Sequence, residues 1–173
     1  MFLRFAAAFV AVAMAAAAPA LADAPLSVQI GPQFPTQSSG RNAGGDVATD
    51  IGANYDVGPP LPLPFRASLQ ADYAHGSHGN GKLDDFGIGI AARLTTPIYA
   101  GAGISLYSVN VRLDDPAAVS RNVVGAGENF FIGDRVLSLP GGLAFSVQGT
   151  YKLLPSAGGV DASNVGVGLR VQL

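Results

Sequence analysis

The sequence has no cysteine and no tryptophan, only one glutamate (Glu128) and only two histidines. Without cysteine, the protein has no disulfide and no thiol chemistry. Charged residues make up 13% of the chain, about half the usual share of a soluble domain. The net charge is −2, and no cluster of Lys and Arg indicates a nucleic-acid partner. Beyond residue 22 no apolar run approaches the length of a membrane-spanning helix, so a place in a membrane would require a closed β-barrel.

Glycine, in contrast, is abundant, with 23 residues among 173. Good helix formers are scarce once the alanine-rich first segment is set aside, and glycine and β-branched residues disfavour helices. This composition predicts an all-β fold.

The first 22 residues have the organisation of a secretory signal peptide. Arg4 provides a positive charge, an uncharged alanine-rich run follows from residue 5 to residue 18, and Ala20-Leu21-Ala22 forms a small-x-small cleavage site. The run is short for a transmembrane anchor and lacks flanking stop-transfer charges. We therefore expect a signal peptide over residues 1–22 and a single mature domain over residues 23–173.

The mature sequence is a series of alternating apolar and polar residues, with turn signals between the segments. A period of two places the two residue types on opposite faces of a strand. The segment at residues 164–173 is the clearest example, because Val165, Val167, Leu169 and Val171 alternate with smaller or polar residues. Eight such segments are expected, at residues 26–34, 47–57, 65–73, 85–94, 98–111, within 123–139, 143–153 and 164–173. An even number of strands suits an antiparallel up-and-down barrel.

An apolar final strand without a polar tail resembles the closing strand of bacterial outer-membrane β-barrel proteins, although Leu173 stands where that family usually has Phe. The architecture resembles small barrels of the OmpA and OmpX kind, without a family-specific motif. The resemblance implies an eight-stranded transmembrane β-barrel in the outer membrane of a Gram-negative bacterium. It also implies contact with outer-membrane lipids, insertion by the barrel-assembly machinery, and a monomeric state.

The connections and the aromatic residues agree with this topology. The longer, polar connections (residues 36–45, 75–82, 112–122 and 155–164) all fall at one end, and the shorter ones (58–64, 95–97 and 140–142) at the other. Outer-membrane barrels have this asymmetry, with the long loops outside the cell. Aromatic residues are expected near the outer rim (Tyr73, Phe86, Tyr151) and near the periplasmic rim (Tyr55, Phe65).

Apolar-Gly-apolar-Gly runs recur in four of the expected strands. They begin at Phe86, Ala100, Val124 and Val165. A dinucleotide-binding loop needs a third glycine and the start of a helix, which these runs lack. We interpret them as small residues on the lumen face that leave space for neighbouring side chains in a narrow barrel.

The expected lumen face also carries charges of both signs. They are Asp50, Arg66, Asp72, Asp85, Arg93, Lys152 and Arg170. An unpaired buried charge is unfavourable, so these groups should pair across the interior and fill it. The sixth strand is ambiguous, because Glu128 and Asp134 share the lipid-facing parity. Either a bulge near Gly127 exchanges the faces or Glu128 lies at the rim.

One segment offers candidate chemistry, the stretch that contains both histidines, His75 and His78. A metal site with Asp84 or Asp85 fits no established ligand spacing. His75-Gly-Ser77 resembles the His-x-Ser of outer-membrane lipid A deacylases, a resemblance that implies hydrolysis. That family completes its triad with a Glu on a neighbouring strand, a place for which this chain offers only Asp84 or Asp85. We interpret the segment as a solvated loop tip.

The sequence therefore predicts a small, non-catalytic outer-membrane barrel with a structural or surface-interaction role and a lumen plugged by polar and charged side chains. We assign no catalytic, cofactor-binding or metal-ligating residue. Two alternatives stay open. One is a soluble periplasmic lipocalin-like carrier, with the apolar face inside. The other is a lipid A-modifying outer-membrane enzyme.

Overall fold

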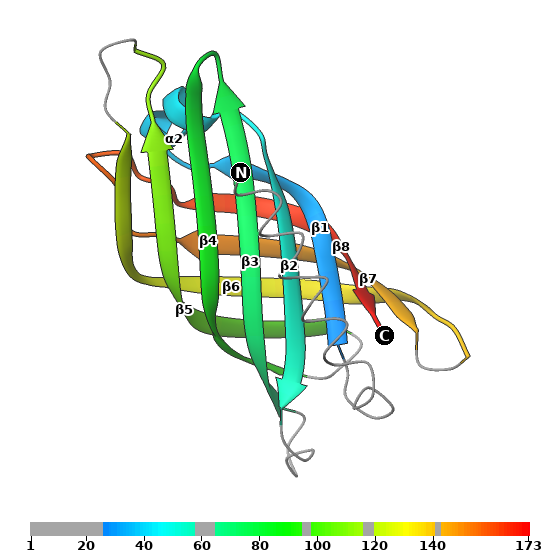
Figure 1. Ribbon diagram of the computed structural model, residues 1–173. Coiled ribbons are helices and arrows are strands. Elements are labelled where there is room, and N and C mark those ends of the chain that lie inside the picture. The colour runs from blue at the N-terminus through cyan, green and yellow to red at the C-terminus, as the bar shows by residue number, and fades with distance from the viewer. Residues whose placement is uncertain (1–25, 58–64, 95–97, 116–119, 141–142) are drawn as a thin grey trace.

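The computed structural model describes residues 26–57, 65–94, 98–115, 120–140 and 143–173, which form one closed barrel of eight antiparallel strands (Figure 1). The strands are β1 (Leu26–Pro35), β2 (Ala48–Val57), β3 (Phe65–His78), β4 (Gly81–Leu94), β5 (Ile98–Arg112), β6 (Arg121–Ser138), β7 (Ala144–Leu153) and β8 (Asn164–Gln172), with a short helix α2 (Ser38–Gly44) between β1 and β2. Each strand pairs with its neighbours in sequence, and β8 pairs with β1. The predicted all-β, eight-stranded, antiparallel up-and-down barrel is confirmed.

Some predictions fall on residues that are not described. The signal peptide at residues 1–22, the connections at 58–64 and 95–97, and most of the connection at 140–142 lie outside the described residues. Among the described residues, no helix is long and apolar enough to cross a membrane.

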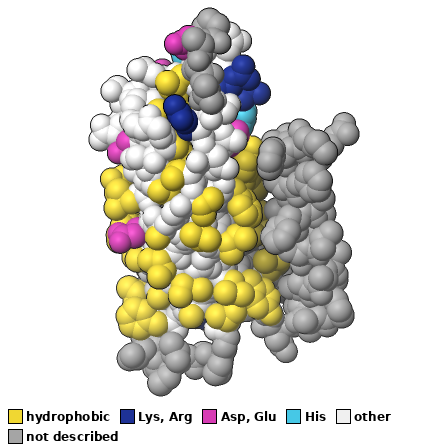
Figure 2. All heavy atoms as spheres, turned by 60° about the vertical axis from the view of Figure 1, so that its left-hand side comes forward, with side chains coloured by type: hydrophobic (Ala, Val, Ile, Leu, Met, Phe, Trp, Pro, Cys, Tyr) yellow, Lys and Arg dark blue, Asp and Glu magenta, His cyan; other side chains and the backbone are white. Residues whose placement is uncertain are grey.

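The two faces of the barrel wall have the predicted polarity. Val167 and Leu169 of β8 are exposed on the outside, whereas Arg170 is buried in the lumen. Over the middle of the barrel the other strands follow the same rule, with Glu128 and Asp134 of β6 as exceptions, so that apolar side chains form a belt on the outside, part of which Figure 2 shows. A lipocalin-like carrier needs the opposite arrangement, with an apolar interior, and the structure contradicts that alternative.

Near the outer end of the barrel the polarity of the two faces reverses without any break in the alternation. On β5, Leu106 faces outward and is 61% exposed, but the outward residues beyond it are Ser108, Asn110 and Arg112. The inward residues at the same level are apolar, and Val109 and Val111 are fully buried. A wall whose outward residues are polar and whose inward residues are apolar is stable in water. The reversal therefore indicates the level at which the barrel would leave the hydrocarbon part of a bilayer.

The inward apolar residues at this end belong to a cluster that closes the lumen. Helix α2 contributes Ala43, and the segment between β7 and β8 contributes Leu154, Ala157, Val160 and Ala162. These residues pack on Leu83, Tyr107, Val109 and Val111 of the wall. The helix and this apolar cap were not predicted, since residues 36–45 and 155–164 were expected to be only polar loops.

The glycines of the repeated runs face the lumen and leave space for large side chains, as predicted. A Cβ atom on Gly87 would overlap the ring of Tyr107, and one on Gly127 would lie 2.7 Å from Cδ2 of that ring. Similarly, a Cβ atom on Gly101 would overlap the ring of Phe131. The lumen position of Tyr107, which an aromatic girdle does not explain, follows from this packing. Tyr99 is accommodated in the same way beside Gly133, where an added Cβ atom would overlap the Tyr99 ring.

Two predicted details are wrong. The 75–82 connection is not a loop, because β3 continues to His78 and β4 begins at Gly81, with only Gly79 and Asn80 between them. Gly79 has a φ of 56°, as the first position of a two-residue type II′ turn requires. In β6 the alternation continues through Gly127, and the only register shift lies between Arg135 and Leu137.

Glu128 therefore faces outward, and neither explanation offered for it holds. It is directly opposite Ile104 on one side and Leu153 on the other, both exposed apolar residues. Val124, farther toward the outer end of the same strand, is 60% exposed. Glu128 thus lies within the apolar belt rather than at its rim.

Candidate functional site

The outer half of the lumen holds a buried cluster around Lys152 of β7. Its Nζ donates hydrogen bonds to Oδ1 of Asp50, at 2.7 Å, and to Oδ2 of Asp72, and it lies 3.9 Å from Oδ1 of Asp85. The side chains of Lys152, Asp50 and Asp85 are at most 3% exposed. One ammonium group thus faces three carboxylates from three other strands, as the prediction of cross-lumen pairing requires.

The other half of the lumen, toward the start of β3 and the end of β4, has an excess of positive charge. Arg93 of β4 forms an ion pair with Asp56 of β2, and both side chains are buried. Nη1 of Arg66 lies 3.9 Å from the same carboxylate, but the Arg66 side chain is 39% exposed. Arg170 donates a hydrogen bond from Nη1 to Gln148 Oε1 at 3.1 Å and lies over the ring of Tyr99. Asp56 was not among the predicted lumen charges, although its parity on the second strand matches that of Asp50.

Amide side chains connect the two clusters. Gln29 donates from Nε2 to Oδ2 of Asp50 at 3.0 Å, and Gln148 donates from Nε2 to Oε1 of Gln29. The Oε1 atom of Gln148 accepts from Arg170 and from the hydroxyl of Tyr99. Hydrogen bonds therefore run without interruption from Lys152 through Asp50, Gln29 and Gln148 to Arg170.

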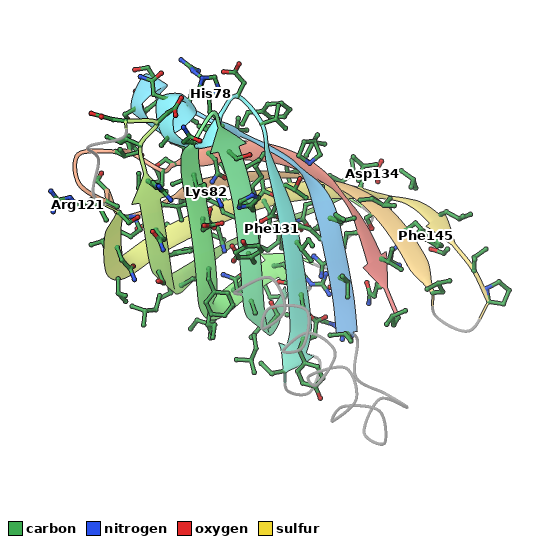
Figure 3. All side chains as sticks on the ribbon, turned by 45° about the horizontal axis from the view of Figure 1, so that its top comes forward. His78, Lys82, Arg121, Phe131, Asp134 and Phe145 are labelled. Carbon is green, nitrogen blue, oxygen red and sulfur yellow. The ribbon has the colours of Figure 1, made fainter. Side chains whose placement is uncertain are left out.

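Little free space remains around this network. The lumen cavity lined by Gln29, Gln70, Asn129, Gln148 and Arg170 has a volume of about 30 Å³. A cavity of that size holds about one or two water molecules, whereas small-molecule pockets are about ten times larger or more. Phe131 adds an aromatic ring inside the barrel (Figure 3). The described lumen is a filled interior and not a pore.

The second candidate site lies on the outer wall, where β3 and β4 rise above the apolar belt. His75 is directly opposite Asp84, and Nδ1 of His75 lies 2.6 Å from Oδ1 of Asp84. The hydroxyl of Tyr73 donates to the same oxygen at 2.9 Å. A carboxylate only accepts hydrogen bonds, so Nδ1 is the protonated nitrogen in this pair and Nε2 is left free to accept a proton.

Ser77 is two residues beyond His75 on the same face of β3 and is exposed. It is directly opposite Lys82, another outward residue. The structure thus brings together His75, Ser77 and Asp84, whereas Asp85 points into the lumen. No hydrogen bond joins Ser77 to His75 among the described residues. Within the described ranges, no group of three or more His, Asp or Glu residues is arranged to hold a metal ion.

The comparisons with known proteins give no family, but they do give a fold. No family model and no curated protein matches the sequence. Among solved structures, Neisserial surface protein A (NspA) matches with a TM-score of 0.57 and 16% identity, over 87% of this chain and 96% of that one. The N-terminal β-barrel domain of Pseudomonas aeruginosa OprF matches with a TM-score of 0.52 and 8% identity, over 86% of this chain and 95% of that one.

The fold is that of a small bacterial outer-membrane β-barrel. The predicted resemblance is thereby confirmed at the level of architecture. The match extends over nearly the whole of both solved chains and over most of this one.

Proposed function

We propose that the protein is a monomeric outer-membrane β-barrel with a closed lumen and a structural or surface-interaction role. The observation that carries the proposal is the distribution of polarity. An apolar belt surrounds the outside, and the interior is filled by charged side chains that pair across it. This distribution suits a bilayer, because lipid covers the belt and ion pairs such as Lys152–Asp50 and Arg93–Asp56 compensate buried charges in the lumen. Insertion by the barrel-assembly machinery and lasting contact with outer-membrane lipids are part of the proposal.

The outer end is the part that offers a surface for interaction. It carries polar outward side chains on β3, β4 and β5, and it is closed from inside by the apolar cap. Such an end presents a fixed surface rather than an entrance, which favours a structural or contact role over transport.

Fractionation of cells that express the full chain tests the proposal. The protein should be recovered with the outer membrane, and it should migrate faster on an unboiled gel than after boiling, because closed barrels stay folded in detergent. Recovery in the soluble periplasmic fraction would contradict the proposal.

A second candidate function, ester hydrolysis on the outer wall, is favoured by the 2.6 Å contact between His75 and Asp84. Asp84 and Tyr73 orient the histidine as the third member of a triad does. In such a reaction Ser77 Oγ would attack an acyl carbonyl and pass its proton to Nε2 of His75, which would then protonate the departing alcohol. Water would hydrolyse the acyl-enzyme and regenerate Ser77 while releasing the fatty acid.

Mass spectra of lipid A from expressing cells test this second candidate. Wild-type protein should remove an acyl chain, and Ser77→Ala and His75→Ala should each abolish that loss. Ser108→Ala is the matched control, since it removes a hydroxyl from the outward face of β5 without changing His75, Ser77 or Asp84. Unchanged lipid A in cells with folded wild-type protein would exclude this activity and leave the structural role in place.

A further inference from the structure

We propose that Lys82 and Arg112, on the outer wall of the barrel, bind the phosphate of a lipid headgroup in the outer leaflet. The inference rests on the proposed function, because it requires this end of the barrel to be at the outer surface of the membrane. It concerns the outside of β4 and β5, separate from the lumen charges described above.

The first observation is that the two cations are cross-strand neighbours. Lys82 is directly opposite Arg112 in the register of β4 and β5, and both side chains are exposed and outward. Like charges at directly opposite positions are unfavourable. No salt bridge joins either one to a carboxylate in the part of the chain that the structure describes. An anion between them would turn this repulsion into attraction.

The carboxylates closest in sequence to Lys82 and Arg112 already accept hydrogen bonds from other groups. Asp84 accepts hydrogen bonds from His75 and Tyr73. Asp114 accepts a hydrogen bond at Oδ1 from the backbone N–H of Asn80, at 2.8 Å. The hydrogen bond between Asn80 and Asp114 joins the tip of the β3–β4 hairpin to the end of β5. It therefore also holds in place the strands that carry the two cations.

Lys82 and Arg112 lie above the apolar belt, at the height expected for a lipid headgroup. On β4, Phe86 is the last aromatic residue of the apolar belt, and Lys82 is four residues farther along, about 13 Å of strand. Outward residues between and beside them are polar, such as Asn110 opposite Asp84. Figure 3 shows Lys82 below His78 at this end of the barrel, and in Figure 2 the Lys and Arg side chains on the visible face lie above the belt. Long basic side chains at this level reach the phosphates of the lipid surface.

The chemistry of the pair favours phosphate over other anions. Arginine offers a planar fork of donors and lysine a compact charge, and together they surround a tetrahedral oxyanion with charge-assisted hydrogen bonds. We expect one phosphate to be bound between the two side chains, with the acyl chains of the same lipid against the apolar belt below.

Native mass spectrometry of the folded barrel tests the site, with bis-phosphorylated lipid A in detergent micelles as the probe. Wild-type protein should retain the lipid, and the double variant Lys82→Gln/Arg112→Gln should retain it about 30-fold more weakly, because each basic residue near a charged surface contributes about 1 kcal/mol. Lipid A stripped of both phosphates should bind wild-type and double variant equally. Excess inorganic phosphate should not displace the lipid, whereas displacement would identify a site for free phosphate instead.

Arg135→Gln is the matched control, since Arg135 is an exposed arginine at the opposite end of the barrel. It lowers the net charge without touching the site and should leave retention unchanged. Equal retention by wild-type and double variant, or an equal loss in Arg135→Gln, would overturn the proposal. Heat-modifiable migration of every variant shows that the barrel is folded, so failure of this site is distinguishable from failure of the proposed membrane location.

Discussion

At the scale of single residues, the two arginines beside Asp56 differ in burial, and so they should differ in importance for stability. The Arg93 side chain is 8% exposed and paired with Asp56, whereas the Arg66 side chain is 39% exposed and 3.9 Å from that carboxylate. Arg93→Met should destabilise the barrel by about 3–5 kcal/mol, because it leaves a buried carboxylate without its main partner.

Arg66→Met is the matched variant, and its cost should be below about 1 kcal/mol because water screens an exposed pair. Urea unfolding in lipid vesicles measures both. The sequence alone predicts equal effects for the two arginines, since parity places both on the lumen face, and only the structure separates them. Equal losses would mean that burial does not decide the strength of these pairs.

The lumen glycines provide a second test at this scale. Gly87→Ala should cost about 1–3 kcal/mol, because the added Cβ meets the fully buried ring of Tyr107, which has no room to move. Gly52→Ala is the control on the same face, where the nearest atom to an added Cβ is 3.6 Å away. Unfolding of the two variants in the same vesicles should separate them, and a Gly87→Ala variant as stable as wild type would contradict the packing described here.

The alternation in the sequence predicted which face of the barrel wall a residue occupies, but not which residue it contacts. Alternation placed Asp50, Lys152 and Arg170 in the lumen correctly. It did not reveal which carboxylate each cation meets, because partners across the interior depend on the shear of the closed barrel. Asp56 is at the end of its strand and takes its importance from Arg93, a residue 37 positions away.

At the scale of elements, β6 carries a carboxylate on its outward, apolar face. Glu128 is within the apolar belt, opposite Ile104 and Leu153. Glu128→Leu should stabilise the barrel in lipid vesicles by about 1 kcal/mol, since it removes a charged group from the lipid-facing wall. Asn122→Leu, on the same outward face above the belt, should bring no such gain. A loss of stability in Glu128→Leu would show that the carboxylate has a partner in the membrane.

The long β3–β4 hairpin was missed because its glycines imitate a loop. Gly76 and Gly81 are required for a different reason. A Cβ atom on Gly76 would lie 2.5 Å from the carbonyl oxygen of Gly44, and one on Gly81 would lie 2.7 Å from that of Ala43. The backbone of helix α2 thus packs directly on the inside of this hairpin. Local composition cannot distinguish a glycine that permits close approach from a glycine that forms a loop.

At the scale of the whole molecule, the filled lumen predicts that the barrel does not conduct. The network from Lys152 to Arg170 occupies the interior, and the apolar cap closes its outer end. Planar-bilayer recordings with the refolded full chain should show no stable conductance of porin size. A reproducible large channel would contradict the closed interior. Lys152→Ala should not open one, because the cap still covers the lumen above it.

The overall architecture was the most predictable level, because alternation, turn signals and strand number all indicate the same closed barrel. The reversal of polarity at the outer end was not recognised, although the sequence contains it. On β5 the inward residues Val109 and Val111 and the outward residues Asn110 and Arg112 continue the same alternation with exchanged chemistry. Assigning that reversal requires knowing where the lipid ends.

In the proposed membrane, β5 crosses the lipid with its apolar face outward and then emerges into water. Because the chain has no cysteine, single cysteines can be introduced one at a time and labelled with a nitroxide in the barrel reconstituted into vesicles. Labels at Ile104 and Leu106 should collide with oxygen dissolved in lipid, labels at Asn110 and Arg112 should collide with an aqueous nickel chelate, and a label at Ser105 should be reached by neither. Free access of the nickel chelate to Ile104, or of oxygen to Ser105 but not Ile104, would show that the outward face of β5 does not face lipid.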